Sequence, residues 1–115
     1  MKINIELKGE VPTKKNSYRI SKHGGFYKPT KITDWETDCL WQIKEQKIPK
    51  MAGHFKVDMI FFITREKDVD NMATSIFDIL QKSQTIDNDS HILELSAIKR
   101  KVKKNPKVLV SVDLI

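Results

Sequence analysis

The sequence contains little of what stabilises secreted or membrane-bound proteins. Its 115 residues include one cysteine, Cys39, which cannot form an internal disulfide, and no Cys/His cluster spaced as in a zinc site. The longest apolar run, residues 59–63, is far shorter than the ~20 residues that cross a bilayer, and the N-terminus lacks a charged-then-apolar leader. We therefore predict a soluble, cytoplasmic protein with no membrane partner, folded as one domain over residues 1–115.

Negative charge is in the minority, and positive charge is concentrated in two segments. Residues 8–31 contain seven Lys or Arg and one acid, and residues 99–107 contain six Lys or Arg and no acid. The rest of the chain has 8 basic and 14 acidic residues, so the overall net charge of +6 hides an acidic middle. Two basic segments beside an acidic site are suited to an enzyme that binds a polyanion. The alternative is that both segments are only solvated loops.

Hydrophobic periodicity predicts an α/β (α+β) fold with a single mixed sheet and two main helices, in the order β-α-β-α-β-β. Residues 2–8 alternate as a half-buried strand, and residues 9–29 form a basic loop or small hairpin that turns at Gly24 and Gly25. A helix begins at Thr30 or Thr33 and ends near residue 47, and strand 54–63 and helix 70–82 follow. Strands 91–102 and 107–115 then form a hairpin. The residues expected on the buried faces of the two helices are Ile32, Trp35, Leu40, Ile43, Met72, Ile76, Ile79 and Leu80.

The stretch DVDNMATSIFDILQKSQTIDNDSHI, residues 68–92, gathers five carboxylates. Asp68 and Asp70 precede or begin the second helix, and Asp87 and Asp89 follow it. Each pair has a structural explanation, because Asp68 could be a helix N-cap and residues 87–90 could be a simple turn. A calcium-binding EF-hand is excluded, because the segment lacks the glycine at the bend and the glutamate at the twelfth position.

The order of these motifs resembles the RusA family of Holliday-junction endonucleases, which are often encoded by phages and prophages. The runs that carry the resemblance are Asp68-Val-Asp70-Asn71, then Phe77-Asp78-Ile-Leu80, then Ile86-Asp87-Asn88-Asp89-Ser-His-Ile92. The likeness extends to the N-terminal strand with its Pro/Lys/Asn loop and to the two C-terminal strands. It therefore covers essentially the whole chain.

The resemblance implies a carboxylate site for Mg²⁺, with Mn²⁺ as a substitute, because hard cations prefer oxygen ligands. Its catalytic and metal-binding residues would be Asp68, Asp70 and Asp89. Side chains that could support them are Asp78, Asp87, Thr74 and Asn71, with a partner elsewhere in the fold as the alternative for Asp78. Thr74 departs from the family pattern, which has a lysine there, so either another lysine, such as Lys67 or Lys82, supplies the charge or cleavage is slow.

The implied substrate is four-way junction DNA, cut by paired symmetric nicks, which leads us to expect a C2 homodimer. Trp35, Trp41 and the apolar faces of the terminal strands are candidates for its interface, or else core. The expected DNA contacts are Lys14, Lys15, Arg19, Lys99, Lys101 and Lys103, the last three forming a stripe on one face of the C-terminal hairpin. The alternatives are a catalytically weak or inactive junction-binding module and a basic interaction protein that binds no DNA. The active-site hypothesis requires Asp89 to return close to Asp70.

Overall fold

The computed structural model describes residues 2–12, 19–20, 26–27 and 30–115. The elements that build the domain are strand β1 (Lys2–Lys8), helix α1 (Thr30–Glu45), strand β4 (Phe55–Ile63), helix α2 (Val69–Lys82), the 3₁₀ turn η1 (Asp89–His91), strand β5 (Ile92–Lys101) and strand β6 (Lys107–Leu114). Two short strands, β2 (Arg19–Ile20) and β3 (Phe26–Tyr27), pair antiparallel. That pairing confirms the small hairpin, whose turn at Gly24 and Gly25 lies outside the described residues.

The four long strands form one mixed sheet in the order β1-β6-β4-β5. Strand β6 is antiparallel to both β1 and β4, and β5 is parallel to β4. The predicted C-terminal hairpin is therefore wrong: β5 and β6 are consecutive in the chain, but β4 lies between them. The apolar alternation of β4 explains its central place, because Phe55, Val57, Met59, Phe61 and Ile63 are all buried.

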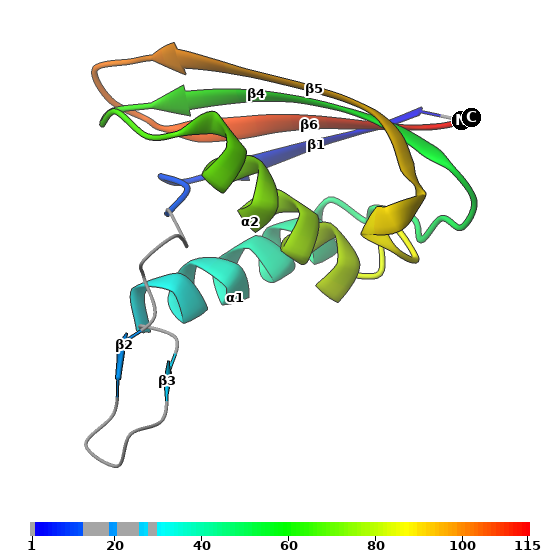
Figure 1. Ribbon diagram of the computed structural model, residues 1–115, viewed down its shortest axis with the longest axis horizontal. Coiled ribbons are helices and arrows are strands. Elements are labelled where there is room, and N and C mark those ends of the chain that lie inside the picture. The colour runs from blue at the N-terminus through cyan, green and yellow to red at the C-terminus, as the bar shows by residue number, and fades with distance from the viewer. Residues whose placement is uncertain (1, 13–18, 21–25, 28–29) are drawn as a thin grey trace.

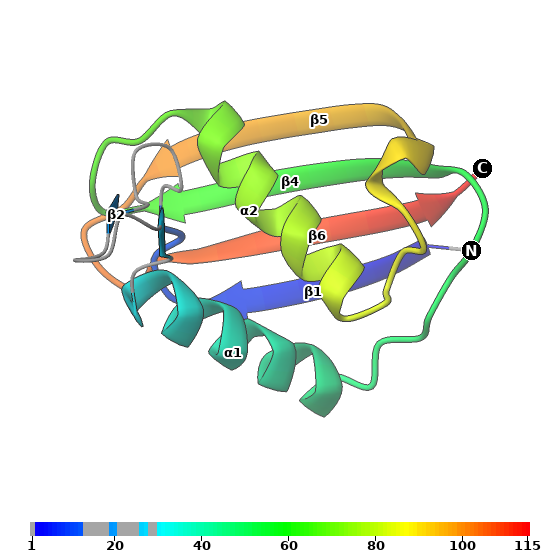
Figure 2. The ribbon, with the colours of Figure 1, turned by 60° about the horizontal axis from the view of Figure 1, so that its bottom comes forward.

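Both helices cover the same face of this sheet (Figures 1 and 2). Helix α2 turns Met72, Ile76, Ile79 and Leu80 into the core, as predicted. Helix α1 buries Ile32, Trp35 and Ile43, but the fourth core position is Cys39 and not Leu40, which is only half-buried. Cys39 lies one helical turn from Trp35 and Ile43, so its spacing fits the buried stripe better. Burial raises the pKa of the Cys39 thiol to about 12.

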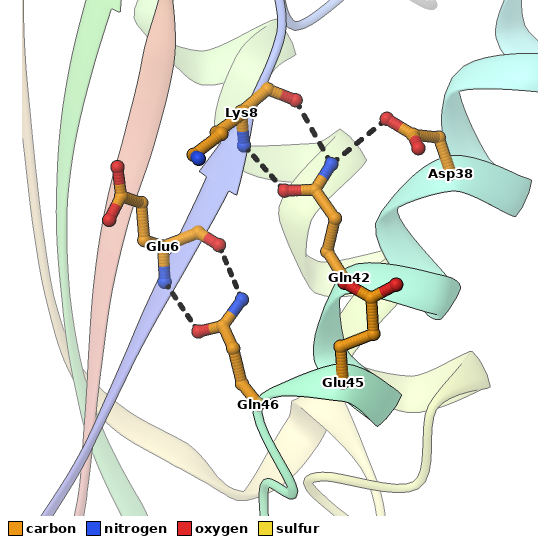
Figure 3. Close-up of a pocket in the computed structure, with 6 residues that line it drawn as sticks. All are labelled: Glu6, Lys8, Asp38, Gln42, Glu45 and Gln46. Atoms are coloured by element: carbon orange, nitrogen blue, oxygen red, sulfur yellow. Dashed lines mark hydrogen bonds between the residues drawn. The ribbon is translucent and has the colours of Figure 1, made fainter.

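The two edges of the sheet are finished differently. At the β1 edge, Gln46, the residue after helix α1, accepts a hydrogen bond from the Glu6 amide and donates one to the Glu6 carbonyl, at 3.1 and 2.7 Å (Figure 3). Gln42 makes the same pair of bonds to Lys8, at 2.7 and 3.1 Å. The two glutamines therefore satisfy backbone groups that an edge strand otherwise exposes. At the other edge, no strand lies beyond β5 in the described part of the chain.

Among the described residues, no helix is both long and apolar enough to span a membrane.

Candidate active site

Asp68 and Asp70 lie together where the loop after β4 enters α2. Asp68 is the N-cap residue, with extended backbone, but its side chain makes no capping hydrogen bond. Asn71 connects the two acids: its amide N–H donates to Asp70 Oδ1 at 3.0 Å, and its side-chain amide nitrogen lies 3.5 Å from Asp68 Oδ2. Both acids are exposed. Their remaining carboxylate oxygens can therefore face a ligand, at the end of the helix whose dipole favours negative charge.

A partly buried ion pair supports the loop that carries these acids. Glu10, just after β1, accepts hydrogen bonds from the Thr64 and Arg65 amides, both at 3.1 Å. Lys67 Nζ lies 3.4 Å from Glu10 and donates to the Val11 carbonyl at 2.6 Å. Burial opposes ionisation of Glu10, but the Arg65 amide, the Lys67 charge and the contacts with Thr64 together lower its pKa. Burial also lowers the pKa of Lys67, while Glu10 counteracts that effect.

The C-terminal end of β5 lies against the same loop. Lys99 forms an ion pair with Glu66 and donates a hydrogen bond to the Lys67 carbonyl at 3.0 Å. The hydrogen bond from Lys99, followed by its charge and that of Lys101, lowers the pKa of Glu66. Lys99 and Lys101 are exposed, and Lys103 is exposed in the connection that follows β5. Three of the predicted DNA contacts therefore lie at the end of the sheet that carries Asp68 and Asp70.

The N-terminal basic segment also begins near this end of α2. The Ser75 hydroxyl, buried on α2, donates to the Pro12 carbonyl at 3.3 Å, which fixes the chain just before residue 13 against the first turns of α2. Lys14 and Lys15 lie outside the described residues, and only the backbone of Arg19 is described, so their predicted DNA contacts stay predictions. The start of their segment is nevertheless next to the Asp68 and Asp70 end of the helix.

Asp89 lies at the opposite end of α2. Its amide donates to the Gln81 side chain at 2.9 Å, next to the last residue of the helix. Asp70 and Gln81 are separated by about 16 Å of helix at 1.5 Å per residue. Ligand oxygens that share one Mg²⁺ lie within ~4 Å of each other, because each is about 2.1 Å from the ion. The predicted return of Asp89 to Asp70 does not occur within one chain, because the two residues lie at opposite ends of α2.

The described residues accordingly contain no group of three or more Asp, Glu, His or Cys side chains that could hold a metal ion. Asp87 is taken up by its own turn: its carboxylate is 3.1 Å from His91 Nδ1 and accepts the Asn88 amide at 3.1 Å. The hydrogen bond from His91 lowers the pKa of Asp87, despite the small opposing effect of burial. Asp78 is half-buried two turns beyond Asp70. Within the described part of one chain, two of the predicted metal-binding carboxylates, Asp68 and Asp70, are neighbours, and the third is not.

Lys67 and Lys82 were the candidates to replace the family lysine that Thr74 lacks. Both are engaged in other contacts. Lys82 forms an ion pair with Glu36 at the far end of α2. Lys67 is close to Asp68 but is held by Glu10 and Val11. The Thr74 hydroxyl donates to the Asp70 carbonyl at 3.0 Å, a backbone contact typical of threonine in a helix. Lys99 is exposed and contacts residues 66 and 67, and sequence reasoning could not place it beside this loop because those contacts cross more than 30 positions of sequence.

Neighbouring acids that can bind a divalent cation, close to lysines that attract phosphates, suit an enzyme that cleaves a phosphate backbone. Comparison with known proteins makes this specific. The family model for endodeoxyribonuclease RusA matches residues 9–113. The chain is also 31% identical over 102 residues to the crossover junction endodeoxyribonuclease RusA of Aquifex aeolicus (strain VF5), covering 86% of this chain and 81% of that protein.

The chain therefore belongs to the RusA endodeoxyribonuclease family, and it is an endonuclease.

Proposed function

We propose that this endonuclease resolves four-way DNA junctions by paired symmetric nicks in a Mg²⁺-dependent reaction. The observation that carries the proposal is the neighbouring pair Asp68 and Asp70 at the N-terminus of α2, beside Lys99 and Lys101. Its substrate is inferred from the Aquifex relative, whose name describes a crossover junction endodeoxyribonuclease.

The two carboxylates fit the chemistry of a hard divalent cation. Mg²⁺ commonly binds through one or two carboxylates and keeps several waters or substrate phosphate oxygens as further ligands. Asp68 and Asp70 would hold it, with Asn71 fixing the orientation of both acids through the contacts described above. When bound, the ion supplies an activated water and stabilises charge on the phosphate. Mn²⁺, which accepts the same oxygen ligands, is expected to substitute.

The lysines at the end of β5 would draw the DNA backbone to these acids. Without them, Asp68 and Asp70 would repel a phosphate. Lys99 is held in place by Glu66 and the Lys67 carbonyl, so its charge stays close to the loop that carries both acids. We assign to Lys99 part of the electrostatic role that Thr74 cannot fill.

Paired nicks on a two-fold symmetric junction require two active sites, so we propose a C2 homodimer as the active unit. The rival function is a module that binds junctions without cutting them, which the threonine at position 74 favours. A basic protein that binds no DNA is the third alternative.

A single assay separates these functions: purified protein with a synthetic mobile four-way junction, in Mg²⁺, Mn²⁺ or EDTA. We expect paired symmetric nicks with either metal and none in EDTA. Asp70→Asn should retain junction binding and lose nicking by about 10³-fold, because removal of a group that acts on the reacting charge has effects of that order. A gel shift without nicks by the unmodified protein would establish the binding module, and neither shift nor nicks would leave the third alternative.

A further inference from the structure

The sheet has one face that neither described helix covers, which we name the open face (Figure 1). Paired strand residues point to the same side of a sheet, so the register gives the rows of side chains that cross this face. Leu7, Val108 and Phe61 are buried on the helix side, and the residues after Leu7 and Phe61 and before Val108 point the other way. At the end where β4 and β5 finish, the row across all four strands is Lys8, Lys107, Phe62 and Arg100. At the opposite end, the row is Lys2, Asp113, Lys56 and Glu94.

These two rows differ in how their charges are balanced. In the Lys2 row the sign alternates from strand to strand, and Lys56 Nζ lies 3.8 Å from Glu94. The Arg100 row has three cations and no acid. Two of these cations, on β1 and β6, are direct cross-strand partners, and like charges in that arrangement are unfavourable. The Arg100 row therefore carries positive charge that it does not neutralise itself, which suits a surface that binds an anion.

The contacts of this row hold its cations in place and leave most of their charge unpaired. Lys107 Nζ lies 5.6 Å from the centre of the Phe62 ring and 3.6 Å from Glu6 in the next row. Arg100 donates to the carbonyl of the residue before it at 3.1 Å, and its side chain is exposed. Lys8 is exposed as well. Of the contacts described for these three cations, one is with a carboxylate.

The helix side of the same sheet end is also basic. Side chains alternate along β5, so Lys99 and Lys101 point to the helix side while Arg100 points to the open face. Lys99 contacts the loop that carries the paired acids. Lys103 and Lys104 are exposed in the connection from β5 to β6, at the tip of the sheet. Positive charge therefore surrounds this end of the sheet on both faces and at the tip.

One straight duplex cannot contact both faces of a sheet, because the two faces point in opposite directions. DNA has a persistence length of about 50 nm, so a short arm does not bend around the end of the sheet. Two arms that diverge from a branch point can lie on the two faces. The phosphates of such an arm match the charge of the open-face row, as the phosphates at the active site match Lys99 and Lys101.

We propose that Lys8, Lys107 and Arg100 bind the phosphate backbone of a second arm of the branched DNA, so that this end of the sheet enters the angle between two arms. The inference rests on the function proposed above, which provides the first arm beside Asp68 and Asp70. It adds a reason for structural selectivity. A linear duplex occupies one face, whereas a junction occupies both, so the open-face cations contribute to affinity for branched DNA alone.

Neutralising two open-face cations tests this selectivity. Arg100→Gln with Lys107→Gln is compared with the unmodified protein by fluorescence anisotropy in EDTA, on a four-way junction and on a linear duplex with the sequence of two arms. We expect junction affinity to fall by about 5- to 20-fold at moderate salt. The slope of log affinity against log salt should fall by up to ~1.8, from about 0.9 for each lost phosphate contact. Duplex affinity should stay within about twofold, because a duplex does not reach the open face.

Two matched variants provide the controls. Lys2→Gln with Lys56→Gln removes the same charge from the other end of the open face and should change neither affinity by more than about twofold. Lys99→Gln with Lys101→Gln removes it from the helix side and should weaken junction and duplex binding alike. An equal loss of junction affinity in the Lys2 and Lys56 variant would show that only net charge matters, and would overturn the inference.

A second open-face variant, Lys8→Gln with Arg100→Gln, keeps the contacts of Lys107 with Glu6 and Phe62 and should show the same selective loss. Circular dichroism and sedimentation of both variants should match the unmodified protein. A changed oligomeric state would mean that the open face meets another copy of the chain, and would overturn the inference. So would unchanged junction affinity in both variants, or equal weakening on junction and duplex.

These measurements are independent of cleavage. If the unmodified protein prefers the junction but does not nick it, the proposed nuclease function fails and the selective loss still decides the role of the open face. If the protein nicks the junction and both open-face variants bind it normally, only the open-face inference fails. An unmodified protein that binds the junction no more tightly than the duplex also overturns it, because no selectivity is then left to explain.

Discussion

The two ends of helix α2 carry the same short pattern, Asp-x-Asp, in different surroundings. At the N-terminal end, Asp68 and Asp70 extend from a loop that Glu10, Lys67 and Lys99 hold in place. At the C-terminal end, Asp87 binds His91 within its own turn, and the neighbouring Asn88 side chain accepts a hydrogen bond from the Ser90 amide at 2.9 Å. The first end is built to present acids, and the second mainly satisfies its own turn. An acid's role is set by the groups around it.

Removing one acid from each end of α2 tests this difference most directly. Asp68→Asn should reduce junction nicking by about 10³-fold with little change in binding, because it removes a carboxylate from the proposed metal site. Asp87→Asn is the matched change at the other end and should keep nicking within about threefold, because Asp87 is engaged with His91. Both rates are measured by strand-specific labelling of the junction at saturating protein. Equal losses in the two variants would show that both Asp-x-Asp pairs contribute to catalysis.

The lysines beside the N-terminal end provide the next largest effect. Simultaneous Lys99→Glu, Lys101→Glu and Lys103→Glu should weaken junction binding by about 10- to 100-fold at moderate salt. It should also reduce the slope of log affinity against log salt by up to ~2.7, from about 0.9 for each lost phosphate contact. Binding is followed by fluorescence anisotropy over a salt series.

A matched triple reversal at Lys44, Lys47 and Lys50 changes the net charge equally, but near the C-terminal end of α1. It should leave most of the salt slope intact. If both triple variants lost affinity and slope to the same extent, only the net charge would matter, and the end of β5 would not be the DNA surface.

Sequence periodicity was sufficient for the elements of this fold, because each strand and helix carries its own apolar pattern. The pairing of the strands was not accessible in the same way. Two consecutive strands with a short turn normally form a hairpin, and nothing in the sequence of β5 or β6 signals that β4 separates them. The exposed apolar side chains of β5, Leu93 and Leu95, reflect that arrangement, because a strand at the edge of a sheet has a neighbouring strand on one side only.

The candidate site shows the same division. The motif around Asp68 and Asp70 located two acids at one helix end, and the structure places them together. The motif around Asp89 carried no information on whether that residue meets the others within one chain, because that depends on the path of the chain after α2 and not on the motif. The Glu10 and Lys67 pair was also invisible in the sequence, since 57 positions separate its members.

The smallest effect that we expect is on stability, and it comes from disrupting the Glu10 and Lys67 pair. Glu10→Gln should lower the free energy of unfolding by about 1–2 kcal/mol near pH 7, because it weakens charged hydrogen bonds to Thr64 and Arg65 and leaves Lys67 without its partner. Chemical denaturation measures the change. The exposed Glu45→Gln is the control and should change stability by less than ~0.5 kcal/mol.

The pH dependence of this stabilisation has a defined sign. The pKa of Glu10 is lower in the folded protein than its ordinary value of 4.5, so the folded state binds fewer protons than the unfolded state as pH falls through that range. Its contribution is therefore complete above about pH 4.5 and is lost as pH drops through the lowered folded value. The stability difference between the wild type and Glu10→Gln should shrink below pH 4.5 and stay constant from pH 5.5 to 7. A difference that instead grew on acidification would mean that Glu10 is held in its protonated form, and that the loop below Asp68 is not supported by its charge.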